Sequence, residues 1–183
     1  MTLGDAKRKT LMLLDEYSSG GEITVDEDIN AKMNDFFDVA QKDIAQWQAI
    51  VRRTTVQLDG TGDQELPSDV ARVIRVRKNG VRVRDYEIID RQLVYESGDT
   101  AALVLDYIAT PETISPDTDD SYAFEVSEQA ANCLPFFVAA QQLIADLVVD
   151  YGAFYNLYLQ MRGMLPRTID GVSGGAVAQR LYR

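Results

Sequence analysis

Histidine is absent from this chain of 183 residues, and cysteine occurs once, as Cys133. The absence of histidine removes the commonest general base and the commonest zinc ligand. A single cysteine cannot form an internal disulfide, and without histidine it lacks the partner that usually activates a catalytic thiolate. Because Cys133 lies in an apolar run, we predict that it is a small core residue in a reducing compartment.

Long apolar runs are also absent. The most apolar segment, 134–149, is interrupted by Gln141, Gln142 and Asp146, so we expect no membrane span. The N-terminal segment mixes cations with acids on a helical period and has no continuous apolar stretch. We therefore predict no signal peptide.

Positive charge is scarce, with 18 Lys and Arg against 29 Asp and Glu, for a net charge of −11. This balance argues against a protein that grips nucleic acid with its whole surface. The charge is uneven, because seven cations face three acids between Arg72 and Arg91. A second basic segment runs from Arg162 to the C-terminus, with four arginines and one acid. An acidic body with two basic patches favours contact with copies of itself or with an acidic partner.

Apolar residues recur with a helical period towards both ends of the chain. Thr2 and Asp5 form a capping-box pattern at the first helix, and Ser127 is a good cap for a later one. The second predicted helix, over 27–53, has the length of a structural strut. The predicted helices cover residues 3–17, 27–53, 127–149 and 152–163.

The period changes to two between these helices, which predicts a β insertion over 55–108. Asn79-Gly80 is a strong hairpin signal, and its register places four arginines on one face, namely Arg75, Arg77, Arg82 and Arg84. Like charges opposite one another are unfavourable, so the four arginines suggest an anionic neighbour. A solvated face, a subunit contact and a nucleic-acid phosphate contact are the alternatives at this point.

The predicted fold is α+β but mainly helical, a helical bundle with a small antiparallel sheet or hairpin insertion. Residues 1–163 are expected to form a single domain. Residues 164–183 are too rich in glycine to hold a helix and end on two apolar anchors between two cations, Arg180, Leu181, Tyr182 and Arg183. We therefore predict an extended C-terminal tail that docks on a partner.

No catalytic set or metal site is predicted. Asp26, Asp28 and Asn30 imitate the start of a calcium loop, but Ala31 and Phe37 stand where the loop needs glycine and glutamate. The acidic loop 111–120, with Asp117, Asp119 and Asp120, lacks the required turn and bidentate ligand. We expect a protein that is not an enzyme and has no cofactor. The alternatives are a monomeric intracellular interaction module and a metal-dependent hydrolase that uses acidic loops.

Three segments of the chain carry a resemblance to a known family. They are MTLGDAKRKTLMLLDEYS at the N-terminus, LPSD at 66–69 before the hairpin, and EQAANCLPFFVAAQQLIAD at 128–146. In this order, and over most of the chain, they resemble the head-to-tail adaptors of tailed bacteriophages, also called connector or neck proteins.

The resemblance implies a structural ring, typically of twelve copies, in the virion neck between capsid and tail. Such a ring is assembled in the host cytoplasm beneath the portal protein, and its other side receives a stopper or tail protein. Genomic DNA passes through its negative channel without sequence-specific binding. A monomer in dilute solution is compatible with this assembly, because the net charge makes copies repel one another.

The resemblance also implies roles for named residues. A C-terminal extension docks on the portal in this family, which assigns portal docking to Arg162, Arg167, Arg180, Leu181, Tyr182 and Arg183. A negative channel disfavours the four hairpin arginines as its lining. Their expected role is therefore a contact with a subunit or neighbour, with Asp117, Asp119 and Asp120 as the complement.

Overall fold

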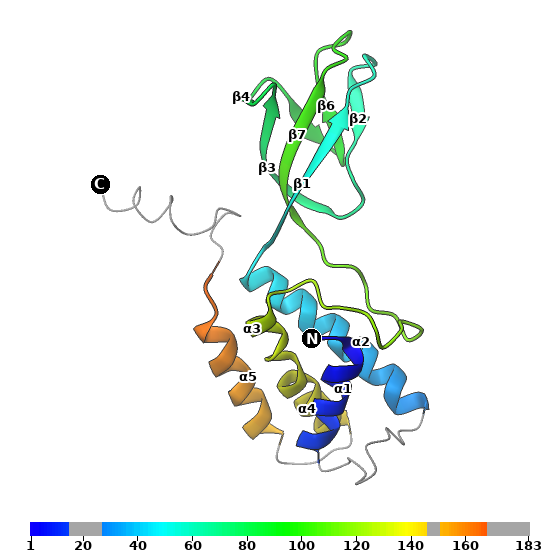
Figure 1. Ribbon diagram of the computed structural model, residues 1–183, viewed down its shortest axis with the longest axis vertical. Coiled ribbons are helices and arrows are strands. Elements are labelled where there is room, and N and C mark those ends of the chain that lie inside the picture. The colour runs from blue at the N-terminus through cyan, green and yellow to red at the C-terminus, as the bar shows by residue number, and fades with distance from the viewer. Residues whose placement is uncertain (15–26, 146–150, 168–183) are drawn as a thin grey trace, which may run out of the picture. The chain divides into compact units, whose positions relative to one another are not determined.

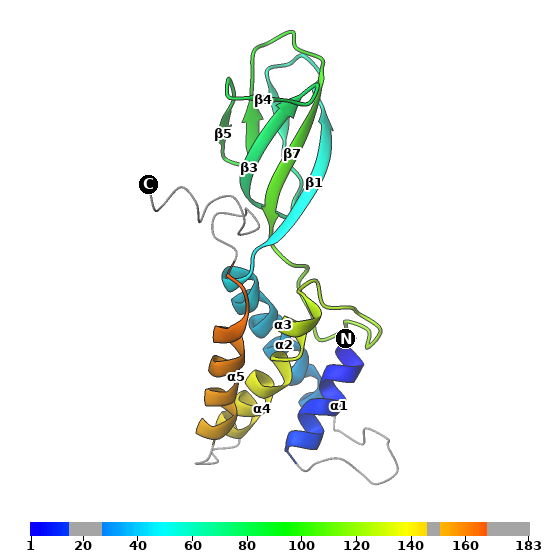
Figure 2. The ribbon, with the colours of Figure 1, turned by 60° about the vertical axis from the view of Figure 1, so that its left-hand side comes forward.

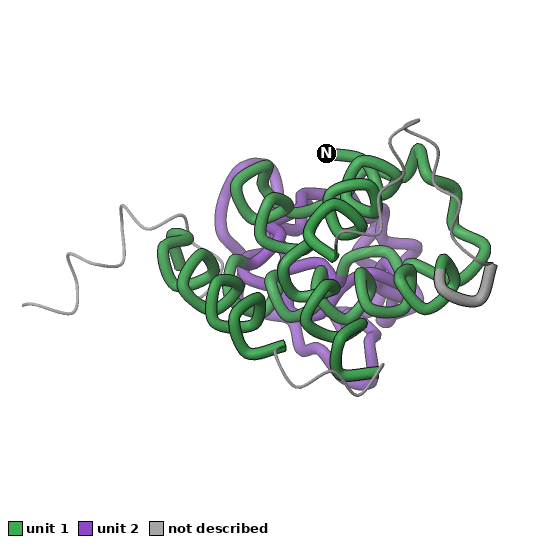
Figure 3. Tube along the Cα trace, turned by 90° about the horizontal axis from the view of Figure 1, so that it is seen from below, with its two compact units in different colours: residues 1–48, 111–167 green, residues 49–110, 168–183 purple. Residues whose placement is uncertain are grey.

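The computed structural model describes residues 1–14, 27–145 and 151–167, which form two compact units. The helical unit comprises Met1–Gln48 and Pro111–Arg167, and the β unit begins at Ala49 and ends at Thr110 (Figure 1, Figure 3). Each unit has a hydrophobic core of its own. Residues 1–163 thus contain parts of both compact units.

The helical unit is built around one central helix. Its elements are α1 (Leu3–Leu13), α2 (Glu27–Trp47), α3 (Glu128–Ala131), α4 (Leu134–Ala145) and α5 (Gly152–Met164). Helix α4 packs against α1, α2 and α5. Its sequence, LPFFVAAQQLIA, is apolar on almost every side, which is typical of a helix surrounded by others.

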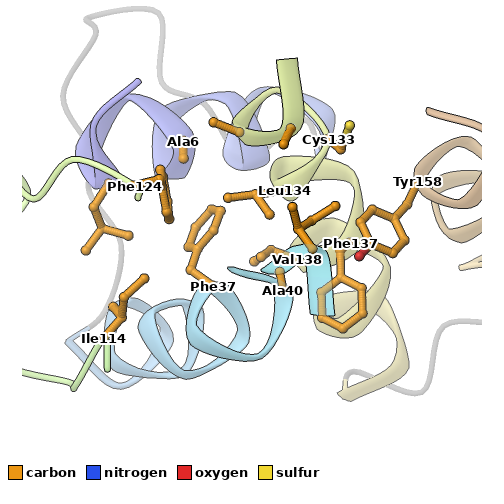
Figure 4. Close-up of a cluster of buried hydrophobic side chains, with 14 of the residues drawn as sticks. Ala6, Phe37, Ala40, Ile114, Phe124, Cys133, Leu134, Phe137, Val138 and Tyr158 are labelled. Carbon is orange, nitrogen blue, oxygen red and sulfur yellow. The ribbon is translucent and has the colours of Figure 1, made fainter. Parts of the chain in front are cut away.

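Aromatic side chains fill the core of the helical unit (Figure 4). The ring centroids of Phe37 and Phe124 lie 5.6 Å apart, and Phe137 meets Tyr158 edge-on at 5.1 Å. Cys133 lies in this core and is 1% exposed, so its predicted core position is confirmed. Burial raises the pKa of its thiol, which keeps it protonated and unreactive.

Helix α1 begins with the capping box that the sequence predicts. The Thr2 hydroxyl accepts a hydrogen bond from the Asp5 N–H at 3.2 Å, and the Asp5 carboxylate accepts one from the Thr2 N–H at 3.3 Å. The helix was expected over 3–17 but ends at Leu13 with Leu14 as its cap, and 15–17 lie outside the described residues.

The start of α1 lies against residues 120–123. The Leu3 N–H donates to the Tyr122 carbonyl at 2.8 Å, and the Gly4 N–H donates to the Asp120 carbonyl at 2.9 Å. A Cβ at Gly4 would lie 3.0 Å from the Asp120 Cβ, so a larger residue here would fit only if the loop moved back slightly. The acidic loop is therefore fixed on the first helix.

The β unit contains two antiparallel sheets that share one core. Its strands are β1 (Ile50–Gln57), β2 (Asp63–Glu65), β3 (Val70–Lys78), β4 (Val81–Val83), β5 (Glu87–Ile89), β6 (Gln92–Val94) and β7 (Ala102–Ala109). One sheet has the order β1-β7-β3-β4 (Figure 2), and the other has the order β2-β6-β5. Leu93 from the smaller sheet and Val76 and Leu105 from the larger one are fully buried between them.

The predicted hairpin and its register are confirmed. Asn79 and Gly80 have positive φ angles of 51° and 78°, as a two-residue turn between twisted strands requires. Strand β3 pairs with β4 so that Arg77 lies opposite Arg82 and Val76 opposite Val83.

The predicted fold class is wrong. The chain is not mainly a helical bundle with a small insertion, because its β region is a compact unit with two antiparallel sheets. The error arises from long-range pairing, since β1 and β3 both pair with β7 along most of their lengths. Pairing of this kind leaves little trace in local sequence patterns.

Two element boundaries also differ from the prediction. The helix expected over 27–53 ends at Trp47, because residues from Ile50 onward pair with β7 and leave Val51 as an exposed strand residue. The β region, expected over 55–108, accordingly spans residues 50–109.

The helix expected over 127–149 consists of α3 and α4, and residues 146–149 lie outside the described part of the chain. Pro135 is the second residue of α4, where its missing N–H costs no helical hydrogen bond. The last predicted helix, 152–163, corresponds closely to α5.

Candidate interaction surfaces

The outer face of the four-stranded sheet is strongly basic. Directly paired residues of an antiparallel sheet lie on the same face of the sheet. On β7, Leu105 and Tyr107 are buried, so the residues that alternate with them lie on the outer face. The residues on this outer face include five arginines and one acid. We call this set the basic face: Arg53, Arg72, Arg75, Arg77, Arg82 and Asp106.

Asp106 organises the centre of the basic face. Its carboxylate accepts a hydrogen bond from Arg53 Nε at 2.6 Å and is also paired with Arg77. Burial raises the pKa of this carboxyl. The hydrogen bond from Arg53 and the charges of Arg53 and Arg77 together lower it by more than burial raises it, so the pKa lies below its usual value. Asp106 is therefore charged at neutral pH and holds two guanidinium groups on the face.

The remaining hairpin arginines project beyond this central cluster. Arg82 is exposed and Arg75 is half-buried, and neither has an ion-pair partner among the described residues. Arg84 is exposed and follows the last residue of β4, outside the strand. The structure thus brings Arg75, Arg77 and Arg82 together on one face and leaves Arg84 at its margin.

Three members of the basic face were not identified from the sequence. Arg53 was assigned to a helix, although the segment IVRRTTVQ alternates in the manner of a strand. Arg72 and Asp106 join the face through β3–β7 pairing that includes irregularities between Val70 and Arg72 and between Val73 and Arg75. Sequence alternation alone does not reveal such irregularities.

The acidic loop has structural contacts within the helical unit. Asp120 pairs with the buried Lys7 at 2.7 Å, and Asp119 accepts a hydrogen bond from the Ser121 N–H at 2.8 Å. Asp117 is exposed and has no ion-pair partner among the described residues. Of the three predicted contact residues, Asp117 is the one whose carboxylate has no partner within the described part of the helical unit.

Two predicted docking residues, Arg162 and Arg167, lie against Trp47 at the end of α2. The Arg167 guanidinium carbon is 3.7 Å from the Trp47 ring centroid, and that of Arg162 is 4.9 Å away. The Trp47 indole also donates to the Leu165 carbonyl at 3.4 Å. We call this arrangement the tryptophan clamp, and it fixes the chain where it leaves α5.

Arg162 is also part of a partly buried polar cluster. Arg162 pairs with Asp43, which also accepts a hydrogen bond from the hydroxyl of Tyr158. Tyr158 is fully buried, and its burial together with the bond to Asp43 raises the pKa of its hydroxyl above the usual range. Arg162 therefore contributes to the packing of α5 on α2.

Helix α5 buries little of its apolar surface. Tyr158 is its one buried residue, whereas Leu157 and Leu159 on its two flanks are 42% and 38% exposed. Met164, on the same flank as Leu157, is 80% exposed. Helix α5 thus presents apolar side chains on both flanks.

The other predicted docking residues, Arg180, Leu181, Tyr182 and Arg183, lie outside the described residues. Within residues 1–14, 27–145 and 151–167, no three acidic or cysteine side chains are grouped closely enough to hold a metal ion. Over the same residues no helix has both the length and the apolar content to cross a membrane.

The chain was compared with protein-family models and with curated proteins. Neither comparison found a match.

Proposed function

We propose that this protein is a structural subunit of the neck of a tailed bacteriophage. Copies of it form a ring that docks on the portal and joins the capsid to the tail, and DNA passes through the channel of this ring. The proposal starts from the resemblance carried by the N-terminal segment, the LPSD turn and the segment at 128–146. In this proposal the chain acts by assembly and not by catalysis.

The exposed flanks of α5 are the observation that carries this proposal. Leu157, Leu159 and Met164 are large apolar side chains on an outer helix, and exposed apolar surface of this kind is typical of a protein contact. Assembly of copies around a portal would remove these side chains from water. A solitary protein gains nothing from exposing them.

The tryptophan clamp refines the expected role of the tail. Because Arg162 and Arg167 are engaged by Asp43 and Trp47, we assign portal docking to the segment that follows them. Its anchors are Arg180, Leu181, Tyr182 and Arg183. The tryptophan clamp holds the start of that segment in place, which lowers the conformational entropy that the segment loses on docking.

The test is to mix the protein with the portal encoded alongside it and to determine the composition of the complex by native mass spectrometry. We expect about one copy per portal subunit, the ratio implied by a ring of matching symmetry. A variant that ends after Arg167 keeps the clamp and should remain folded but lose portal binding.

Two results would contradict this proposal. If the full chain does not bind a folded portal, the monomeric interaction module becomes the better hypothesis. If the variant ending at Arg167 binds as well as the full chain, portal docking does not belong to the tail. A Leu157→Gln, Met164→Gln variant should still bind through its tail but load fewer copies per portal.

A further inference from the structure

We infer that the basic face of the β unit docks on the acidic helical unit of a second copy of this chain. The contact joins two unlike surfaces that every copy carries. The inference rests on the proposed function only in requiring that copies associate, and it names the surfaces through which they do so.

The charge of the chain is divided sharply between its units. The helical unit, residues 1–48 and 111–167, has 7 Lys and Arg against 18 Asp and Glu, which is a net charge of −11. The β unit has 9 against 10, a net charge of −1. Within this nearly neutral unit, five arginines and a single acid lie on the basic face.

The basic face is organised before any partner binds. Arg53 and Arg77 are held by Asp106 in the middle of a four-stranded sheet, so little side-chain freedom remains to be lost. Arg82 and Arg75 have no ion-pair partner among the described residues and are available to a carboxylate from outside. Arginine suits this role, since its planar group binds carboxylates in two-pronged geometry.

The other side chains of the basic face favour a protein partner over nucleic acid. Val51, Val104 and Ile108 lie between the arginines, and Val51 is 48% exposed. Arginine among exposed apolar side chains is typical of protein interfaces.

The tyrosines of the β unit do not contribute to this face. Tyr86, Tyr95 and Tyr107 all pack in the core of the unit, so they are not placed to stack on bases. The net charge of −11 on the whole chain also repels a polyanion at long range.

The helical unit offers exposed carboxylates of the complementary charge. Asp35 on α2 and both Glu112 and Asp117 in the following segment are exposed. The Asn34 amide donates to the carbonyls of Ser115 and Pro116 at 2.9 and 3.1 Å, which holds Asp117 close to this part of α2. These carboxylates are the surface that we expect the basic face to meet.

A contact between unlike surfaces has a consequence for the assembly. It can be repeated from copy to copy, so it produces a ring where the rotation closes and a filament where it does not. Contact of one basic face with another is disfavoured, because five arginines facing five arginines would repel.

The experiment is sedimentation velocity over a range of protein concentrations, at an ionic strength that screens the long-range repulsion. We expect the full chain to self-associate, and expect Arg82→Glu and Asp117→Lys each to weaken association by about tenfold or more. Arg91→Glu and Glu96→Lys make the same charge changes at exposed positions outside the basic face and should associate like the unchanged chain.

Mixing the two weakened variants is the decisive step. The Arg82→Glu protein keeps its acidic surface and the Asp117→Lys protein keeps its basic face, so the mixture contains one intact pair of surfaces. We expect the mixture to regain the association that each variant alone has lost, because the intact basic face of one meets the intact acidic surface of the other. A mixture that stays monomeric, or a chain that never self-associates, would overturn the inference.

Two further outcomes would also overturn it. Salt-sensitive binding of duplex DNA that Arg82→Glu abolishes, with no effect on self-association, would assign the face to nucleic acid. If Arg82→Glu and Asp117→Lys change the stability of the protein, and this change does not depend on protein concentration, the two surfaces make their contact within one chain. Because none of these measurements includes the portal, a failure here is distinct from a failure of the proposed function.

Discussion

Asp106 shows how a single carboxylate can support a surface of the opposite charge. It lies on β7 between Arg53 of β1 and Arg77 of β3, and it is 9% exposed. Without it, two guanidinium groups would face each other across the middle strand of the sheet. Its charge therefore stabilises both the β unit and the arrangement of the basic face.

The charge of Asp106 makes the β unit sensitive to acid. Because the pKa of this carboxyl is lower in the folded state than its usual value of 3.8, its contribution is complete above that value and is lost as the pH falls below it. We expect Asp106→Asn to lower the free energy of unfolding by about 1–2 kcal/mol at neutral pH. In urea titrations at decreasing pH, the difference from the unchanged chain should shrink, and a constant difference would contradict this account.

Lys7 presents the reverse case, a buried cation held by one carboxylate. It is 1% exposed and pairs with Asp120, whose side chain is 54% exposed. We expect Asp120→Asn to destabilise the protein by about 1–2 kcal/mol, less than for a fully buried pair because water reaches the carboxylate.

Asp117 provides the control in the same loop. It is exposed and unpaired among the described residues, so Asp117→Asn should change the free energy of unfolding by less than about 0.5 kcal/mol. Equal losses for the two variants in urea unfolding would show that the ion pair with Lys7 does not stabilise the fold.

At the scale of elements, α5 packs on α4 and is joined to the end of α2 by a few individual side chains. Tyr158 and Arg162 reach Asp43, and Trp47 lies under the guanidinium groups of Arg162 and Arg167. These are polar and cation–π contacts at the edge of a core, whereas α4 is held by apolar burial on most of its surface. The link between α5 and α2 therefore depends on a few individual side chains.

The buried hydroxyl of Tyr158 tests this dependence. Tyr158→Phe removes its hydrogen bond to Asp43 while leaving the aromatic packing, and we expect a loss of about 1 kcal/mol. Tyr155→Phe removes a hydroxyl from an exposed ring of the same helix and should have almost no effect. Denaturation monitored by the single tryptophan, which contacts α5, would reveal the difference, and two equal losses would contradict the assigned hydrogen bond.

Local chemistry determined which elements could be predicted. The capping box at Thr2 and the Asn79-Gly80 turn depend on residues close in sequence, and both were predicted correctly. The end of α2 was not, because Ile50 becomes a strand residue only through pairing with the distant Ala109. Likewise, the contacts of Arg162 and Arg167 with Trp47 were not predicted, because they span more than a hundred residues.

At the scale of the whole molecule, the β unit is an insertion into the helical unit. The chain leaves the helical unit after Gln48 and re-enters it at Pro111. Ile50 and Ala109 are paired, so the two ends of the β unit lie about 5 Å apart. The two ends can therefore be joined directly, without a connection that crosses the sheet.

This arrangement predicts that the insertion can be removed. Replacing residues 49–110 by about three glycine or serine residues spans the gap between the paired ends. We expect a helical protein that unfolds cooperatively, because α1, α2, α4 and α5 keep their shared core. Circular dichroism with thermal melting measures this, and a molten or aggregated product would show that the helical unit needs its insertion.

The shortened protein also separates the two proposed contacts. It keeps the C-terminal segment assigned to the portal and loses the basic face assigned to a second copy. We therefore expect it to bind the portal but not to associate with itself in solution. If the shortened protein instead associates with itself but does not bind the portal, portal docking would belong to the β unit and self-association to the part of the chain that remains.

Because the helical unit is discontinuous in sequence, the ribosome synthesises the whole β unit before the second part of the helical unit. When synthesis reaches Thr110, every strand of the β unit is present, whereas α1 and α2 still lack the central helix α4 against which they pack. The nascent chain can therefore complete its second unit before its first. Until α4 has been synthesised, the apolar stripes of α1 and α2 lack the helix against which they pack and stay exposed to water.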